Sequence, residues 1–159
     1  LHFVRNHGPV PIKSPTEADR EEVYNSWRVK IHGAVEKEVT VSIADLEALP
    51  RVVRPCLLVC AGNRRKEQNT VKKTIGFNWG AAGLSCSTWE GCRLIDVLAL
   101  AGIKPKAEGA KHVHFTGPPG ELPKGEDGSY VTSLKREYAL NPDNDVLLVW
   151  KQNGESEIR

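Results

Sequence analysis

Residues 52–69 read Val-Val-Arg-Pro-Cys-Leu-Leu-Val-Cys-Ala-Gly-Asn-Arg-Arg-Lys-Glu-Gln-Asn. The apolar run from Val52 to Val59 predicts a buried strand that ends in a turn carrying a single thiol, Cys60. Ala61 and Gly62 leave space beside the sulfur, and three consecutive cations follow. A thiol among positive charges is biased toward the thiolate, which binds metals, and the same cations attract an anion. The stretch therefore indicates a metal–oxo or phosphorylated cofactor with an anionic substrate.

The composition is that of one soluble globular domain. The chain has 159 residues, of which 40% are hydrophobic and 26% charged. The net charge of +2 is too small for an electrostatic nucleic-acid binder, and residues 64–73 form the only dense basic patch. No apolar run is long enough to predict a membrane helix. The chain has no methionine and ends just after a predicted strand and turn, which is expected of a mature or trimmed domain.

The four cysteines do not have the spacing of a paired zinc knuckle. They are separated by C-x3-C and C-x5-C rather than C-x2-C intervals. Without a secretion signal, a reduced cytosolic set is expected. Cys56 and Cys92 are predicted to be small buried residues, whereas Cys86 lies in a loop whose role is open. A non-catalytic zinc-binding module that uses all four cysteines is the alternative from a different functional class.

The remaining elements predict an α+β domain, because strands and short helices do not alternate regularly. A capping box at Ser42–Asp45 predicts a short helix, and Leu94, Val97, Leu98 and Ala101 predict a second one that ends at Gly102. The glycine-rich stretch from Cys60 to about Trp89 predicts a long irregular loop that wraps a cofactor. The other expected elements are a hairpin from Trp27 to Val41, a strand around Val113 and Phe115, a loop over 117–128, a short helix within 134–140, a strand at Val146–Trp150 and a hairpin turn at Asn153-Gly154.

Three motifs carry a resemblance to a known family. Residues 60–69, followed by Gly76-Phe77-Asn78-Trp79-Gly80, resemble the molybdenum-cofactor domain of eukaryotic assimilatory nitrate reductases, which belong to the sulfite oxidase superfamily. A second motif matches at Phe3–Pro11, and a third at Tyr130–Leu134. The resemblance implies a sulfite oxidase-type molybdopterin-binding fold with mixed sheets and short helices. It is incomplete at its C-terminal end, because the family's later Asp-His-Gly-Phe-Pro-x-Arg segment does not occur in residues 1–159.

The resemblance also implies roles for individual residues. Cys60 corresponds to the single protein ligand of molybdenum. Arg5 and Arg65 correspond to residues near the substrate, and a guanidinium can donate two hydrogen bonds to planar nitrate. Glu121 stands where sulfite oxidases place a cofactor-binding Asp. The molybdopterin contacts implied at the N-terminus are Phe3, Val4, Arg5, Asn6 and His7.

The implied activity is reduction of nitrate to nitrite by oxygen-atom transfer at the Cys60-bound molybdenum, in nitrate assimilation. A sulfite oxidase-type molybdoenzyme is the alternative on the same scaffold. The family resemblance further implies a cytoplasmic, homodimeric NAD(P)H enzyme in which a heme module of the same polypeptide delivers electrons. The heme, FAD, NAD(P)H and dimerisation domains are absent from residues 1–159, so this partial molybdopterin-binding domain is expected to be inactive alone.

Overall fold

The computed structural model of the protein describes residues 16–120 and 128–154. Its α-helices are α1 (Glu17–Ser26), α2 (Ile43–Glu47), α3 (Arg65–Val71), α4 (Leu94–Ala101) and α5 (Arg136–Ala139). Its strands are β1 (Arg28–Ile31), β2 (Val39–Ser42), β3 (Arg51–Val59), β4 (Leu84–Arg93), β5 (His112–Thr116), β6 (Val131–Lys135) and β7 (Leu147–Gln152), with short 3-10 turns at η1 (Lys106–Glu108) and η2 (Pro142–Asn144). This mixture of short helices and strands confirms the predicted α+β class.

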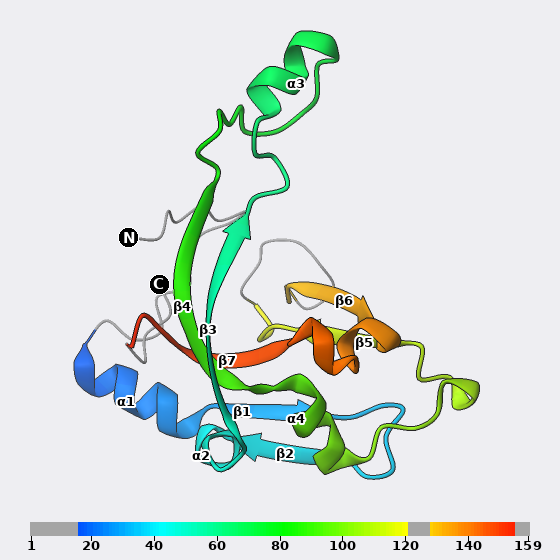
Figure 1. The fold of residues 1–159 in the computed structure, drawn as a ribbon. Helices are drawn as coiled ribbons and strands as arrows, with labels where there is room; N and C mark the ends of the chain where they lie inside the picture. Colours follow the sequence, from blue (N-terminus) through cyan, green and yellow to red (C-terminus); the bar gives the residue numbers. More distant parts are fainter. Residues whose placement is uncertain (1–15, 121–127, 155–159) are drawn as a thin grey trace.

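The described chain has a packed base and a projecting arm (Figure 1). The base holds α1, α2, α4 and the β1–β2 pair, and the β5–β6 pair lies beside it. The third sheet, in the order β3-β4-β7, starts in the base, but the β3–β4 pair continues upward and carries α3 at its tip. We call β3, β4 and the connection between them the arm. It carries the Cys60 turn.

The hairpin and short helix after residue 27 form as predicted. Gly33 makes the turn with φ 93°, and Ile31 of β1 and Val41 of β2 are buried. The hydroxyl of Ser42 accepts a hydrogen bond from the Asp45 amide at 3.2 Å, and the Asp45 carboxylate accepts one from the Ser42 amide at 2.8 Å. Both halves of the capping box are therefore present at the start of α2.

Helix α1 is an element that the sequence analysis missed. The sequence signal of this helix is a second capping box, in which Thr16 and Asp19 form reciprocal hydrogen bonds at the start of α1. The Tyr24 hydroxyl of α1 donates to the Glu47 carboxylate of α2 at 2.7 Å, which joins the two helices. Burial and this bond to Glu47 raise the pKa of Tyr24 well above its usual value. A neutral tyrosine thus keeps its donor at every physiological pH.

The core of the base forms around α4. Its four predicted apolar positions are all buried, and Gly102 ends the helix with φ 66°, as predicted. Cys92 on β4 is fully buried beneath this helix, in agreement with its predicted structural role. Burial, with the Asp96 carboxylate nearby, raises the pKa of the Cys92 thiol to about 11.

Strand β7 pairs with β4 through a ladder that contains a β-bulge. Glu90 pairs with Lys151, but the next residue, Gly91, pairs with Val149, so Trp150 is an extra residue on the β7 side. The backbone of β7 comes so close to Gly91 that a Cβ there would stand 2.1 Å from the Leu148 carbonyl oxygen. This bulge coincides with a Trp150 side chain that is only 5% exposed and belongs to the core.

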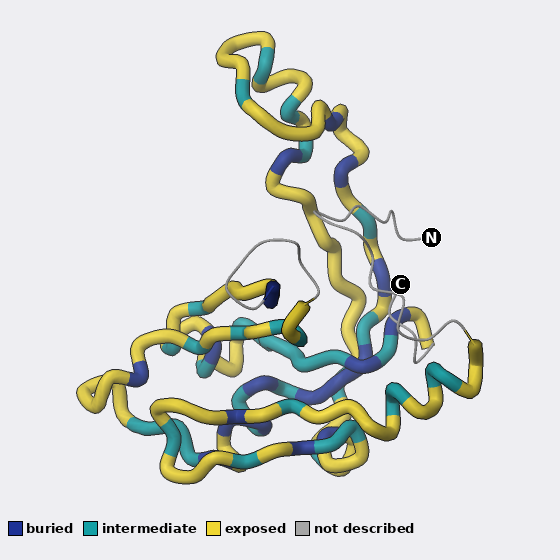
Figure 2. Tube along the Cα trace, turned by 180° about the vertical axis from the view of Figure 1, so that it is seen from behind, coloured by how far each residue is buried: buried dark blue, intermediate teal, exposed yellow. Residues whose placement is uncertain are grey.

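Two predictions about the arm are wrong. The strand at Val52–Val59 exists, but it is exposed rather than buried, because β3 and the upper part of β4 rise out of the base as a projecting pair (Figure 2). Cys56 is exposed for the same reason. The predicted irregular loop up to Trp89 instead contains α3 and most of β4. Gly76, with φ 129°, lies at a bend of this stretch, whereas Gly91 beyond it lies inside β4.

The C-terminal predictions are partly confirmed. The short helix predicted within 134–140 is α5, whereas the preceding residues 131–135 form β6, which was not predicted. Asn153 and Gly154 both have positive φ, as the predicted turn requires. Within residues 16–120 and 128–154, every helix is too short or too polar to cross a membrane.

Candidate functional site at the Cys60 turn

Cys60 directly follows β3, where the chain turns at the top of the arm. Its thiol is free and exposed, and its sulfur accepts a hydrogen bond from the Gly62 amide at 3.4 Å. The Cys60 amide donates to the Gly83 carbonyl at 2.9 Å, and the Asn63 amide donates back to the Cys60 carbonyl at 2.9 Å. The backbone on both sides of the sulfur is thus hydrogen-bonded, so the thiol has a defined direction.

The irregular segment that precedes β4 closes the turn. Gly83 donates from its amide to the Asn63 side-chain oxygen at 2.9 Å, and a Cβ on Gly83 would press on that oxygen and on the Trp79 ring at 3.1 Å. The Arg64 amide donates to the Gly80 carbonyl at 2.9 Å. Residues 79–83 therefore form the opposite wall of the Cys60 turn, and glycine permits the close approach.

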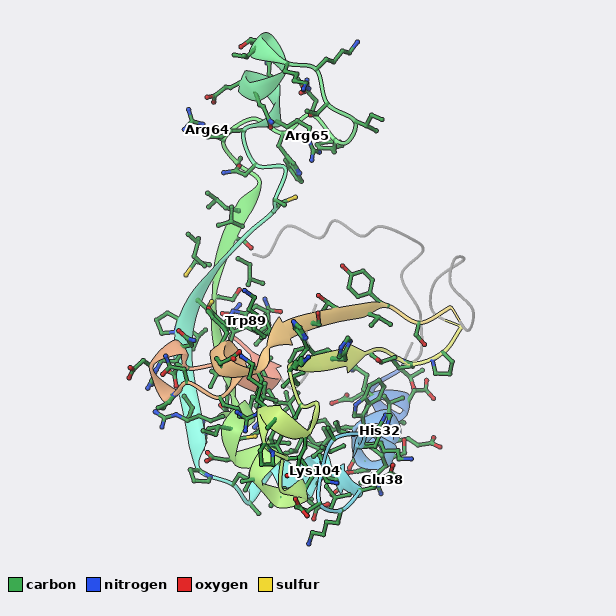
Figure 3. The ribbon with its side chains drawn as sticks, turned by 90° about the vertical axis from the view of Figure 1, so that its right-hand side faces the viewer. His32, Glu38, Arg64, Arg65, Trp89 and Lys104 are labelled. Atoms are coloured by element: carbon green, nitrogen blue, oxygen red, sulfur yellow. The ribbon has the colours of Figure 1, made fainter. Side chains whose placement is uncertain are left out.

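The two arginines of the turn have different surroundings, and they leave it on opposite sides (Figure 3). Arg64 adopts a left-handed conformation with φ 64° and forms an ion pair with Glu67 through its guanidinium. This hydrogen bond lowers the pKa of the Glu67 carboxyl and raises that of Arg64. The charge of Arg64 is thereby compensated at the surface.

Arg65 is half-buried, and its guanidinium lies against Gly62 of the Cys60 turn. One guanidinium nitrogen donates to the Phe77 carbonyl at 3.0 Å. A Cβ on Gly62 would stand 2.8 Å from this nitrogen, and one on Gly76 would stand 2.3 Å from it. The guanidinium therefore lies in a slot that two glycines leave open, and one of these glycines is the residue that donates to the Cys60 sulfur.

Of the predicted site residues, Cys60 and Arg65 both lie against Gly62. Phe3, Val4, Arg5, Asn6, His7 and Glu121 lie outside the described residues. His112 and His114 share one face of β5, with ring centroids 6.4 Å apart. Across residues 16–120 and 128–154, no three His, Cys, Asp or Glu side chains gather closely enough to hold a metal ion.

The side chains that shape the loop beyond α3 were not predicted from the sequence. Asn69 accepts hydrogen bonds from the amide and hydroxyl of Thr74 at 2.8 and 3.0 Å, and it donates to the Asn78 side chain at 3.1 Å. Phe77 and Trp79 contact each other edge to face, with ring centroids 4.7 Å apart. The asparagine was a detectable signal, because Asn side chains often bond to nearby backbone.

Comparison with known proteins identifies the family of the chain. Residues 7–156 match the family model described as "Oxidoreductase molybdopterin binding domain". The chain is 52% identical over 155 residues to the NADH nitrate reductase of Ulva prolifera and 50% identical over 153 residues to that of Volvox carteri. It is 47% identical over 156 residues to NADH nitrate reductase 1 of Oryza sativa subsp. japonica. These alignments cover 96–98% of this chain but only 16–17% of each relative.

A solved structure supports the fold. The sulfane dehydrogenase SoxCD from Paracoccus pantotrophus superposes with a TM-score of 0.58 at 23% identity, over 83% of this chain and 30% of the other. At this identity the likeness concerns the fold alone. The family match spans nearly the whole chain, and the nitrate reductase relatives align over the same stretch. The chain therefore belongs to the oxidoreductase molybdopterin-binding domain family, in which its resemblance to nitrate reductases had placed it.

Proposed function

We propose that this chain binds a molybdenum cofactor through Cys60 and forms part of the active site of a nitrate reductase. The observation that carries the proposal is the free, exposed Cys60 thiol, which shares Gly62 with the Arg65 guanidinium. A soft thiolate ligand and a cation for an anionic substrate thus meet in one turn. The names of the relatives supply the substrate, since they are NADH nitrate reductases.

The residues present fit the cofactor. Thiolate donors suit a soft transition-metal centre, and the Gly62 amide donates a hydrogen bond to the Cys60 sulfur. Phe3, Val4, Arg5, Asn6, His7 and Glu121 are the proposed pterin contacts. When bound, the molybdenum cofactor supplies two-electron oxygen-atom transfer, which no amino-acid side chain provides. The part of this chain is to hold and orient the cofactor and the anion.

Arg65, with Arg5, is proposed to bind the nitrate. A guanidinium carries five N–H donors, of which Phe77 receives one in the described contact. Two parallel N–H groups match two oxygens of a planar oxyanion. Arg64 is a poorer candidate, since its guanidinium is paired with Glu67.

The complete enzyme is proposed to be cytoplasmic and homodimeric, with heme, FAD and NAD(P)H modules in the same polypeptide and with the heme module as electron donor. These features are what the family resemblance implies, and this chain spans about one sixth of the length of its NADH nitrate reductase relatives. Its domain is proposed to be part of the molybdopterin-binding unit.

The test is Cys60→Ser in the complete enzyme. We expect loss of nitrate reduction and of bound molybdenum, because a neutral hydroxyl is a poor ligand for a soft centre. Reduction of an artificial acceptor by NAD(P)H should persist, since it uses other modules. Cys86→Ser is the matched control, an exposed thiol on the same arm, and should retain both properties. Nitrate reduction at a near-normal rate in Cys60→Ser would refute the proposal, and activity on sulfite alone would favour the sulfite oxidase alternative.

A further inference from the structure

The guanidinium of Arg65 depends on a loop outside any helix or strand. The slot that holds it, here called the arginine slot, consists of Gly62, Gly76 and the Phe77 carbonyl. Gly62 is part of the Cys60 turn, but Gly76 and Phe77 belong to residues 72–78, which follow α3. The position of the charge is therefore determined by whatever holds this loop.

Asn69 is the side chain that holds the loop. Its amide oxygen accepts from the Thr74 amide and hydroxyl, and its nitrogen donates to the Asn78 side chain. Thr74 and Asn78 flank the two slot residues, so one side chain fastens both ends of the slot's outer wall. Asn69 also lies four residues after Arg65 on α3, and residues with this spacing share a helix face.

We propose that Asn69 is a positioning residue that keeps the Arg65 guanidinium in the arginine slot, against the Gly62 residue whose amide bonds the Cys60 sulfur. The proposal rests on the proposed function and deepens it, because it names what orients the anion-binding cation. The Gly62 amide donates to the Cys60 sulfur, and the space left by its missing Cβ is taken by the Arg65 guanidinium, so this glycine neighbours both groups. Without Asn69, residues 74–78 lose three side-chain hydrogen bonds and the Phe77 carbonyl loses its fixed place.

The test measures the local charge at Cys60 rather than catalysis. The intact protein is prepared without molybdenum cofactor and with the Cys56→Ser substitution. One sample is treated with a dianionic nitrobenzoate disulfide, and a parallel sample with the neutral disulfide dithiodipyridine. Peptide mass spectrometry quantifies the adduct on Cys60. The ratio of the two rates cancels the thiolate fraction and reports the nearby positive charge.

We expect Asn69→Ala to lower the anionic-to-neutral rate ratio by about three- to tenfold at low ionic strength, toward the value of Arg65→Gln. Val71→Ala, on the same helix and 91% exposed, should keep the wild-type ratio. A wild-type ratio in Asn69→Ala overturns the proposal. So does a wild-type ratio in Arg65→Gln, because the guanidinium would then not be felt at the sulfur.

A milder variant guards against loss of folding. Asn78 is exposed, and Asn78→Ala removes one of the three bonds. Its ratio should fall about twofold, and circular dichroism checks that α3 persists; an unchanged ratio again overturns the proposal. In the complete enzyme, Asn69→Ala should raise the KM for nitrate while kcat and molybdenum content stay within about twofold. A changed labelling ratio with an unchanged KM would keep the positioning role and refute the nitrate role of Arg65.

Discussion

Replacing Gly91 with alanine should separate β7 from β4. The added Cβ would stand 2.1 Å from the Leu148 carbonyl oxygen and 2.7 Å from the Val149 Cα, whereas ordinary contact begins at 3.4 Å. Both neighbours are backbone atoms, so no change of rotamer relieves the clash. The strands must move apart by about 1 Å, and the bulge at Trp150 must shift with them.

These contacts determine how much Gly91→Ala should lower the free energy of unfolding. Overpacking a well-packed site costs about 1–3 kcal/mol, and each buried backbone group that loses its partner adds about 1–3 kcal/mol. Gly91→Ala should therefore lower the free energy of unfolding by about 3–5 kcal/mol, a large part of the total for a domain of this size. In urea this corresponds to a fall of about 1–3 M in the unfolding midpoint.

Urea titration followed by tryptophan fluorescence and circular dichroism provides the measurement. Gly80→Ala is the matched control, because no atom lies within 4 Å of its added Cβ and its φ lies outside the left-handed region. Its stability should stay within about 0.5 kcal/mol of wild type, as for an ordinary surface substitution. If Gly91→Ala lost less than about 1 kcal/mol while the control behaved as expected, the close approach of β7 would not be real.

Three further outcomes are expected. Neutral dithiodipyridine should modify three thiols in the native chain and Cys92 only on unfolding, since Cys92 alone is buried; fast reaction of all four would contradict the packing under α4. Asp145→Asn should cost about 1–2 kcal/mol in urea titrations at low salt and less at high salt, because one carboxylate bonds Arg54 at 2.8 Å and Arg93 at 3.1 Å. The Ser42 hydroxyl and amide lower the pKa of Asp45, so its contribution is present above its unfolded pKa of about 4 and is lost as pH falls through the lower folded value. Asp45→Asn should therefore reduce the fall in the urea midpoint that wild type shows as the pH is lowered below about 4. An unchanged fall would exclude a contribution of Asp45 to acid stability.

Local signals in the sequence were enough for several helices. The capping box at Ser42 and the spacing of apolar residues in α4 lie within one or two helical turns, so neighbours along the chain decide them. The same reasoning could have found α1, whose Thr16–Asp19 box was overlooked. Helix α3 was not predictable in this way, since its N-cap is a left-handed Arg64 with no side-chain cap.

The sequence by itself determined that a free thiol follows a strand and that cations crowd the turn after it, because both are properties of consecutive residues. Only the tertiary structure decided which cation lies against Gly62 of the Cys60 turn. That choice depends on Gly76 and Phe77, eleven and twelve residues beyond Arg65, and on Asn69, which holds their loop. The tertiary structure also decided that β3 is exposed. The burial of a strand depends on which other elements pack against its faces, and the apolar residues of the strand do not specify those elements.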